Sequence, residues 1–241
     1  LYDCIDRCIE NKRIFIADPI LDPINYGFTQ SITRYSELRK RYPDIHIMMG
    51  TGNVTELTHA DTTGMTMILM GIISELKINH ILTTEVSKHC RTVIKESDLA
   101  RRIILAASLG NTTPKHINSG LLTTHEEDPI RYNAQEVEEL FEQVKDSSYR
   151  IMNTDDGVNL FNKKGLQVAI DPFDFFEKID VGDDTGHAFY LGVELARAQI
   201  AHQLGKTYEQ DEELKWGCLV DEKIDDKLEF KEQGPTFKKK K

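Results

Sequence analysis

The sequence lacks any apolar run that approaches the ~20 residues needed for a membrane-spanning helix. It also lacks a basic segment followed by an apolar stretch at its beginning, so nothing in it predicts secretion. We therefore expect a cytoplasmic protein without a membrane partner. Because the chain begins with Leu1 inside a predicted helix, we also expect that its true N-terminus is missing.

Cysteine is scarce, and its spacing matches neither a zinc knuckle nor a CxxC motif. The four cysteines are Cys4, Cys8, Cys90 and Cys218. Free thiols in a reducing compartment are the simplest interpretation. The sequence therefore predicts neither a disulfide framework nor a metal site.

Positive charge is in deficit, with 30 Lys and Arg against 40 Asp and Glu and a net charge of −10. Nucleic-acid binding draws most of its affinity from a basic face, so this composition argues against a nucleic-acid partner. Four lysines end the chain at residues 238–241, which we interpret as a solubilising end. The 39% hydrophobic and 29% charged residues are typical of a globular protein.

Strands and helices alternate in the first half of the chain, which predicts βαβ units and a parallel sheet. Three strands cannot close a barrel, so we expect either a doubly wound sheet or only the last three or four repeats of a barrel. The expected strands are Arg13–Ala17, Ile45–Met49 and His80–Thr83, and the expected helices are Thr29–Arg41, Met65–Leu76 and one between residues 87 and 108.

The second half has a different texture and predicts a small α+β module. Alternating residues at Tyr149–Ile170, broken by two turn dipeptides, indicate two or three antiparallel strands. Thr185 is expected to cap a helix that stops at Gly205. The expected division is a barrel half at 1–126, a connecting helix at 127–147, the α+β module at 148–220 and a loosely ordered tail at 221–241.

Polar residues follow each predicted strand of the first half, where ligands of parallel α/β units bind. A fixed carboxylate can accept paired N–H bonds from an amino-heterocycle, and an asparagine offers both a donor and an acceptor. Glycines let the backbone approach a ligand. The candidates are Asp18, Asp22 and Asn25 after the first strand, Gly50, Gly52 and Asn53 after the second, and Thr84 and Glu85 after the third.

Each candidate also has a structural interpretation. Asp18 and Asp22 could simply end a strand and a loop, the glycines could form a tight turn, and Thr84 could cap the next helix. In the second half, His187 stands in the first turn of a predicted helix and is either a ligand or general base or an ordinary structural residue.

Two motifs resemble a known superfamily. Residues 13–57, from Arg-Ile-Phe-Ile-Ala-Asp-Pro-Ile to Gly-Thr-Gly-Asn-Val-Thr-Glu-Leu, resemble the last strands of the pterin-binding barrels. That superfamily includes dihydropteroate synthases and methyltetrahydropterin:corrinoid methyltransferases. Residues 187–217, with His-Ala-Phe-Tyr-Leu and Glu-Leu-Ala-Arg-Ala, resemble the C-terminal module of the archaeal-type dihydropteroate synthase-related proteins.

The resemblance implies the C-terminal part of a (β/α)8 barrel in which Asp18 and Asn53 contact a pterin. It implies a dihydropteroate synthase-like transferase that uses a tetrahydromethanopterin- or folate-type cofactor. The alternatives are a methyltransferase, favoured by Asn53, and a non-catalytic pterin-binding or assembly subunit; a corrinoid has no support in the sequence itself. Gly52-Asn53-Val54 and Thr83-Thr84-Glu85 replace the Ser-Arg-Lys and Arg-x-His of the synthases. The expected partner is the missing N-terminal barrel half or a second copy.

Overall fold

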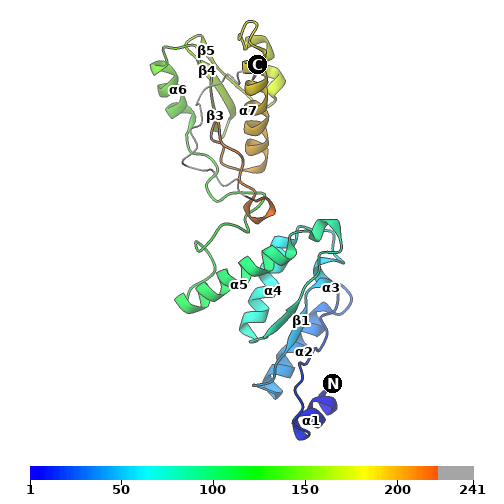
Figure 1. Ribbon diagram of the computed structural model, residues 1–241. Coiled ribbons are helices and arrows are strands. Elements are labelled where there is room, and N and C mark those ends of the chain that lie inside the picture. The colour runs from blue at the N-terminus through cyan, green and yellow to red at the C-terminus, as the bar shows by residue number, and fades with distance from the viewer. Residues whose placement is uncertain (222–241) are drawn as a thin grey trace, which may run out of the picture. The chain divides into compact units, whose positions relative to one another are not determined.

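A computed structural model describes residues 1–221, which form two units (Figure 1). The first unit comprises Leu1–Leu121 with Gly217–Leu219, and the second comprises Leu122–Trp216 with Val220 and Asp221. The expected boundary at residue 126 therefore falls within the second unit. The tail expected at 221–241, with its terminal lysines, lies outside the described residues apart from Asp221.

The first unit alternates helices with short strands in the predicted order. Its elements are α1 (Tyr2–Glu10), α2 (Phe28–Arg41), β1 (Met48–Gly50), α3 (Gly52–Thr55), α4 (Thr62–Glu75), β2 (His80–Leu82), the 3-10 turn η1 (Lys88–Cys90) and α5 (Val93–Gly110). The returning segment adds the 3-10 turn η3 (Gly217–Leu219). These elements confirm the predicted alternation.

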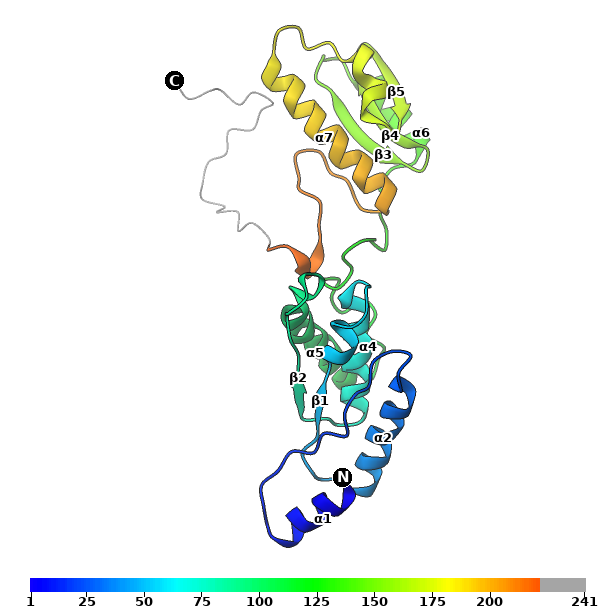
Figure 2. The same cartoon turned by 90° about the vertical axis from the view of Figure 1, so that its right-hand side faces the viewer.

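The sheet of the first unit is parallel and follows the order of the chain. β1 pairs with β2 from Met48 opposite His80 to Gly50 opposite Leu82, and the two strands lie side by side in Figure 2. On the other side of β1, Ala17 forms a single parallel bridge with Ile47. The strand expected at Arg13–Ala17 is thus reduced to one bridge, because its outer edge has no neighbouring strand within the described residues.

Helices cover one face of this sheet. Ile47 and Met49 are completely buried and share a core with Leu38 of α2, Leu69 of α4 and Ala100 of α5. Side chains alternate between the two faces of a strand, so Ile16, Met48 and Leu82 belong to the opposite face. Ile16 is 49% exposed and Leu82 54% exposed, and that face is called the open face below.

Arg39 of α2 fixes the chain at the amino ends of the strands. Its guanidinium donates hydrogen bonds to the backbone carbonyls of Leu76 and Lys77 after α4 and of Pro43 and Ile45 before β1, at 2.7–3.0 Å. Five donors in a planar fork suit this role, since a single arginine can satisfy several loop carbonyls at once. Arg39 therefore links the connection between α2 and β1 to the connection between α4 and β2.

The second unit contains a three-stranded antiparallel sheet in the order β3-β4-β5. Its elements are α6 (Ala134–Gln143), β3 (Arg150–Thr154), β4 (Gly157–Asn162), β5 (Gly165–Ala169), the 3-10 helix η2 (Pro172–Lys178) and α7 (Thr185–Leu204). The predicted antiparallel trio and the long helix are confirmed. α7 ends at Leu204, directly before the predicted stop at Gly205, whose φ of 61° is left-handed and suits a glycine C-cap.

This sheet is covered on both faces, with α6 and α7 on opposite sides (Figure 1). Leu160 packs against α7, and Phe161, which points the other way, meets Phe141 of α6 edge-on at 6.3 Å between ring centroids. The helix expected to connect the two parts therefore belongs to the core of the second unit. The cap of α7 is also one residue earlier than expected, because Asp184 accepts the hydrogen bond from the His187 amide.

The architecture is mixed α/β, with one small parallel sheet and one small antiparallel sheet. Residues 1–221 contain no closed barrel. Among these residues, no helix combines the length and apolar character needed to cross a bilayer.

Candidate functional site

Asp18 lies at the carboxyl end of the bridged segment, directly after Ala17. Its Oδ1 accepts hydrogen bonds from the Ile20 amide at 2.8 Å and from the Tyr35 hydroxyl at 2.9 Å. Its Oδ2 has no hydrogen bond to any residue in the described part of the chain. The carboxylate is thus held in place by one oxygen while the other stays available.

Tyr35 of α2 supports the carboxylate from inside the core, where its side chain is fully buried. Burial, reinforced by the hydrogen bond to Asp18, raises the pKa of the Tyr35 hydroxyl far above its ordinary value. The hydroxyl therefore stays protonated and serves as a permanent donor to Asp18.

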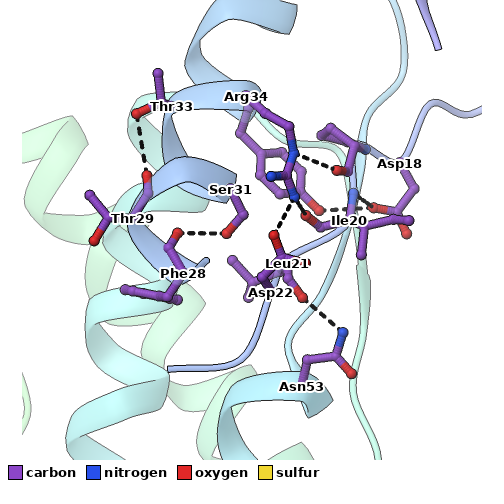
Figure 3. A network of polar contacts seen from close by, with 12 residues as sticks. Asp18, Ile20, Leu21, Asp22, Phe28, Thr29, Ser31, Thr33, Arg34 and Asn53 are labelled. Atoms are coloured by element: carbon purple, nitrogen blue, oxygen red, sulfur yellow. Dashed lines mark hydrogen bonds and ion pairs between the residues drawn. The ribbon is translucent and has the colours of Figure 1, made fainter. Parts of the chain in front are cut away.

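Arg34, the neighbour of Tyr35 on α2, holds the loop that follows Asp18 (Figure 3). Its guanidinium donates to the carbonyls of Pro19 and Ile20 and pairs with Asp22 at 2.7 Å. Asp22, a candidate ligand contact from the sequence, is therefore engaged in an ion pair. Charge-assisted contacts of this kind fix the geometry of a loop more firmly than neutral ones.

The loop held by Arg34 has a strained backbone. Ile20 has a φ of 65°, a conformation that is an outlier for a β-branched residue. Asn25 has a φ of 67°, which asparagine tolerates, and Gly27 has a φ of 106°. A side chain at Gly27 would approach Asp22 Oδ2 at 2.9 Å. Strain of this kind persists only where surrounding contacts enforce it, and it is concentrated at functional sites.

Asn53 reaches the same loop from the end of β1. Its Nδ2 donates to the Leu21 carbonyl at 2.8 Å, as Figure 3 shows. Gly50 has no atom within 4 Å of the position that a Cβ would occupy, so space is open above the end of β1. A Cβ on Gly52 would instead meet Thr84 Oγ1 at 3.0 Å. The structure thus brings Asp18, Asn53 and Gly50 to one edge of the sheet.

Thr84 and Glu85, after β2, have partners within the protein. Glu56, which sequence reasoning did not select, accepts hydrogen bonds from Thr84 Oγ1 and from the amides of Val86 and Ser87 at 2.7–2.9 Å. Hydrogen bonds from Ser87 and Val86 lower the pKa of Glu56 to about 2. Glu85 accepts from the Ile94 amide at the start of α5. These carboxylates organise the loop after β2.

A second polar cluster lies on α7. Glu194 is 2% exposed, and its Oε2 accepts from the Tyr208 hydroxyl at 2.8 Å and the Asp211 amide at 3.1 Å. Its Oε1 accepts from Arg197. His187 lies beside the rings of Tyr149 and Tyr190, at 6.5 and 6.1 Å between centroids. The cluster fastens the chain after α7 to the helix.

Comparison with known proteins gives one curated relative, the uncharacterized protein MJ0107 of Methanocaldococcus jannaschii. The two are 34% identical over 233 residues, which cover 87% of this chain and 44% of the relative. The chain therefore spans less than half the length of the relative that it matches. No family model matches the chain, and no solved structure matches it significantly.

Sequence reasoning missed the residues that position the candidates. Arg34 and Tyr35 lie more than ten residues from the loop that they hold, and no motif marks them. Their only signal is the helical pattern that puts Tyr35 on the buried face of α2. Within residues 1–221, no group of three His, Cys, Asp or Glu side chains is arranged to hold a metal ion.

Proposed function

We propose that the first unit is the C-terminal part of a pterin-binding (β/α)8 barrel, and that the full-length protein is a dihydropteroate synthase-like transferase. The cofactor would be of the tetrahydromethanopterin or folate type. The support is topological: the three parallel segments follow one another in chain order, and helices pack against one face only. A barrel keeps all its helices outside, whereas a doubly wound sheet has helices on both faces.

The proposal requires further strands, and two observations support a missing half. The open face presents exposed apolar side chains of the type that fill a barrel interior. The chain also covers only 44% of its relative. The preferred partner is therefore an N-terminal barrel half, with a second copy of this chain as the substitute when that half is absent.

Asp18 is the single observation that carries the ligand assignment. A pterin presents adjacent N–H donors that a carboxylate accepts. Oδ1 already takes two internal donors, so the bond to the pterin falls to Oδ2. Asn53 keeps its side-chain oxygen for the ring while its nitrogen holds the Leu21 carbonyl. The residues present fit a flat amino-heterocycle that lies over Gly50.

Calorimetric titration of the chain with tetrahydrofolate and tetrahydromethanopterin tests the proposal. In Asp18→Asn the amide oxygen can keep both internal bonds of Oδ1, while the amide nitrogen replaces the free acceptor. A hydrogen bond to a charged group contributes about 1.5–3 kcal/mol, so the affinity should fall by roughly 10- to 150-fold. Asp44→Asn, at an exposed aspartate outside this loop, is the control and should bind nearly as well as the wild type. Equal affinity of Asp18→Asn and wild type would reject the site.

A further inference from the structure

Lys206, directly after α7, is a buried amine without a hydrogen bond. Its side chain is 0% exposed, and its Nζ has no hydrogen-bond partner among residues 1–221. Lysine is almost never fully buried unless it is paired. Burial lowers the pKa of the Lys206 amine, so the unprotonated form is favoured relative to an exposed lysine.

Two side chains, Glu126 and Trp216, lie next to this amine. Glu126 Oε1 lies 4.0 Å from Nζ and is itself buried without a hydrogen-bond partner among the described residues. That separation is too long for a hydrogen bond. An oxygen atom of a bound molecule between the two groups could still carry a proton from Nζ to Glu126. The other oxygen of Glu126 is fixed by the Thr207 hydroxyl at 2.7 Å. The centroid of the Trp216 ring lies 4.8 Å from Nζ.

Lys206 is the first residue of a loop that ends at Trp216. Residues 206–216 contain no helix or strand. Tyr208 and Asp211 are fastened to Glu194, and Gln210 bonds to the Ile151 amide, so the middle of the loop is anchored. Trp216 stands at its far end, immediately before Gly217, whose φ is 55°. The Trp216 ring thus contacts the amine from beyond the anchored part of the loop.

We propose that Lys206 is a reactive amine that captures a small aldehyde or ketone as a Schiff base, with Glu126 as its proton shuttle and Trp216 as its cover. A desolvated lysine is the usual nucleophile for this reaction. An exposed lysine is mostly protonated at pH 7 and reacts slowly, and a buried lysine kept for stability alone would be expected to have hydrogen-bond partners.

The reaction balances without an oxidant or reductant. The Nζ lone pair forms a C–N bond to the carbonyl carbon, and the π electrons of the C=O bond move to oxygen. Glu126 takes a proton from the nitrogen and returns it to that oxygen, which gives a carbinolamine. Glu126 then takes the remaining N–H proton and delivers it to the hydroxyl group, which leaves as water while the nitrogen electron pair forms the C=N bond. One amine and one carbonyl compound thus become one imine and one water.

Reductive trapping on the full chain tests the proposal. The chain is incubated with acetaldehyde and cyanoborohydride at pH 7, and the modified lysines are mapped by peptide mass spectrometry. Lys206 should be modified several-fold faster than Lys215, an exposed lysine of the same loop. Modification of Lys215 while Lys206 stays unmodified would overturn the proposal.

Two variants test the roles of the neighbours. Glu126→Gln should slow the modification of Lys206 several-fold and leave that of Lys215 unchanged. An unchanged rate at Lys206 would exclude Glu126 as the proton shuttle. Because Trp216 is the single tryptophan of the chain, its fluorescence should change as the adduct forms in the wild type and not in Lys206→Met. A change of equal size in that variant would assign the signal to another lysine.

Discussion

The two units differ in how many faces of their sheets are covered by helices. In the second unit, α6 and α7 cover both faces of the antiparallel sheet, and Phe161 and Leu160 are buried on its two sides. In the first unit, helices cover one face, and Leu82 on the other is half exposed. The comparison indicates that the sheet of the second unit is covered on both faces, whereas the sheet of the first unit leaves apolar side chains on one face partly exposed.

One buried ionisable group from each unit shows how far such groups can differ in their hydrogen bonds. In the first, the carboxylate of Glu96 is fully buried and accepts hydrogen bonds from the hydroxyls of Thr62 and Thr92 at 2.8 Å. In the second, the Lys206 amine has no hydrogen-bond donor or acceptor partner among the described residues. A buried polar group with hydrogen bonds contributes to a specific fold, and one without them is a candidate for chemistry.

The largest effect is expected in the core of the second unit. Phe161→Ala removes a buried ring and should lower the free energy of unfolding by about 3–5 kcal/mol. Trp216 lies in the second unit, so its fluorescence during urea denaturation is expected to report on that unit. Phe173→Ala, at a ring that is 84% exposed, is the control and should change stability by less than about 0.5 kcal/mol. Similar losses in both variants would contradict a complete core.

In the first unit, Arg39→Met should lower the free energy of unfolding by about 2–3 kcal/mol, because several loop carbonyls lose a charged donor. The part of the circular-dichroism transition that reports on the first unit should move to lower urea concentration. The transition followed by tryptophan fluorescence should stay in place. Arg41→Met removes an exposed ion pair with Asp6 and the stacking of the guanidinium on Tyr2 and Tyr42, and should cost no more than about 1 kcal/mol. A shift of the tryptophan signal in Arg39→Met would mean that the units do not unfold separately.

A pH dependence should distinguish the units further. The pKa of Glu56 is lowered to about 2 in the folded protein, against an ordinary value of about 4.3 when unfolded. Its stabilisation is therefore present above about pH 4.3 and is lost as the pH falls towards 2. Glu56→Gln should make the first unit less stable at pH 6 and flatten its loss of stability on acidification. Identical acid profiles for wild type and variant would show that Glu56 does not hold the loop after β2.

The smallest effect is expected from relief of strain beside Asp18. Ile20 is 57% exposed, so Ile20→Asn gives up little buried surface and allows the positive φ that asparagine tolerates. The variant should raise the stability of the first unit by roughly 0.5–1 kcal/mol in thermal unfolding. A loss of stability would show that the Ile20 side chain contributes more than its conformation costs.

Local signals predicted much of the fold. The alternation of apolar runs with helical spacing located β1, β2, α2 and α4, and turn dipeptides located the three antiparallel strands. The strand at Arg13–Ala17 was wrong beyond its last residue, because a strand also needs a neighbour that the pattern cannot supply. The helix at 134–143 was found but misplaced as a connector, because its contacts with β4 and β5 come from residues distant in sequence.

Of the candidate site, only the residues that directly follow the parallel strands could be predicted from the sequence. Residues after parallel strands must lie at one edge, which is why Asp18, Gly50 and Asn53 come together. The partners that orient them could not be inferred from the sequence. Tyr35 and Arg34 belong to α2, and no local pattern shows which side of that helix contacts the loop after Ala17. The role of Glu56 was missed for the same reason, because its donors lie some thirty residues away.

The most direct test of whether the open face of the first unit takes a partner is sedimentation velocity of the chain at micromolar concentration. The open face predicts a self-associated species that Leu82→Lys converts to monomer by placing a charge on that face. Ile68→Lys, at a side chain of α4 that is 66% exposed, should leave the association unchanged. A compact monomer for the wild type, with the same sedimentation coefficient as Leu82→Lys, would contradict an open face that requires a partner and with it the proposed half-barrel.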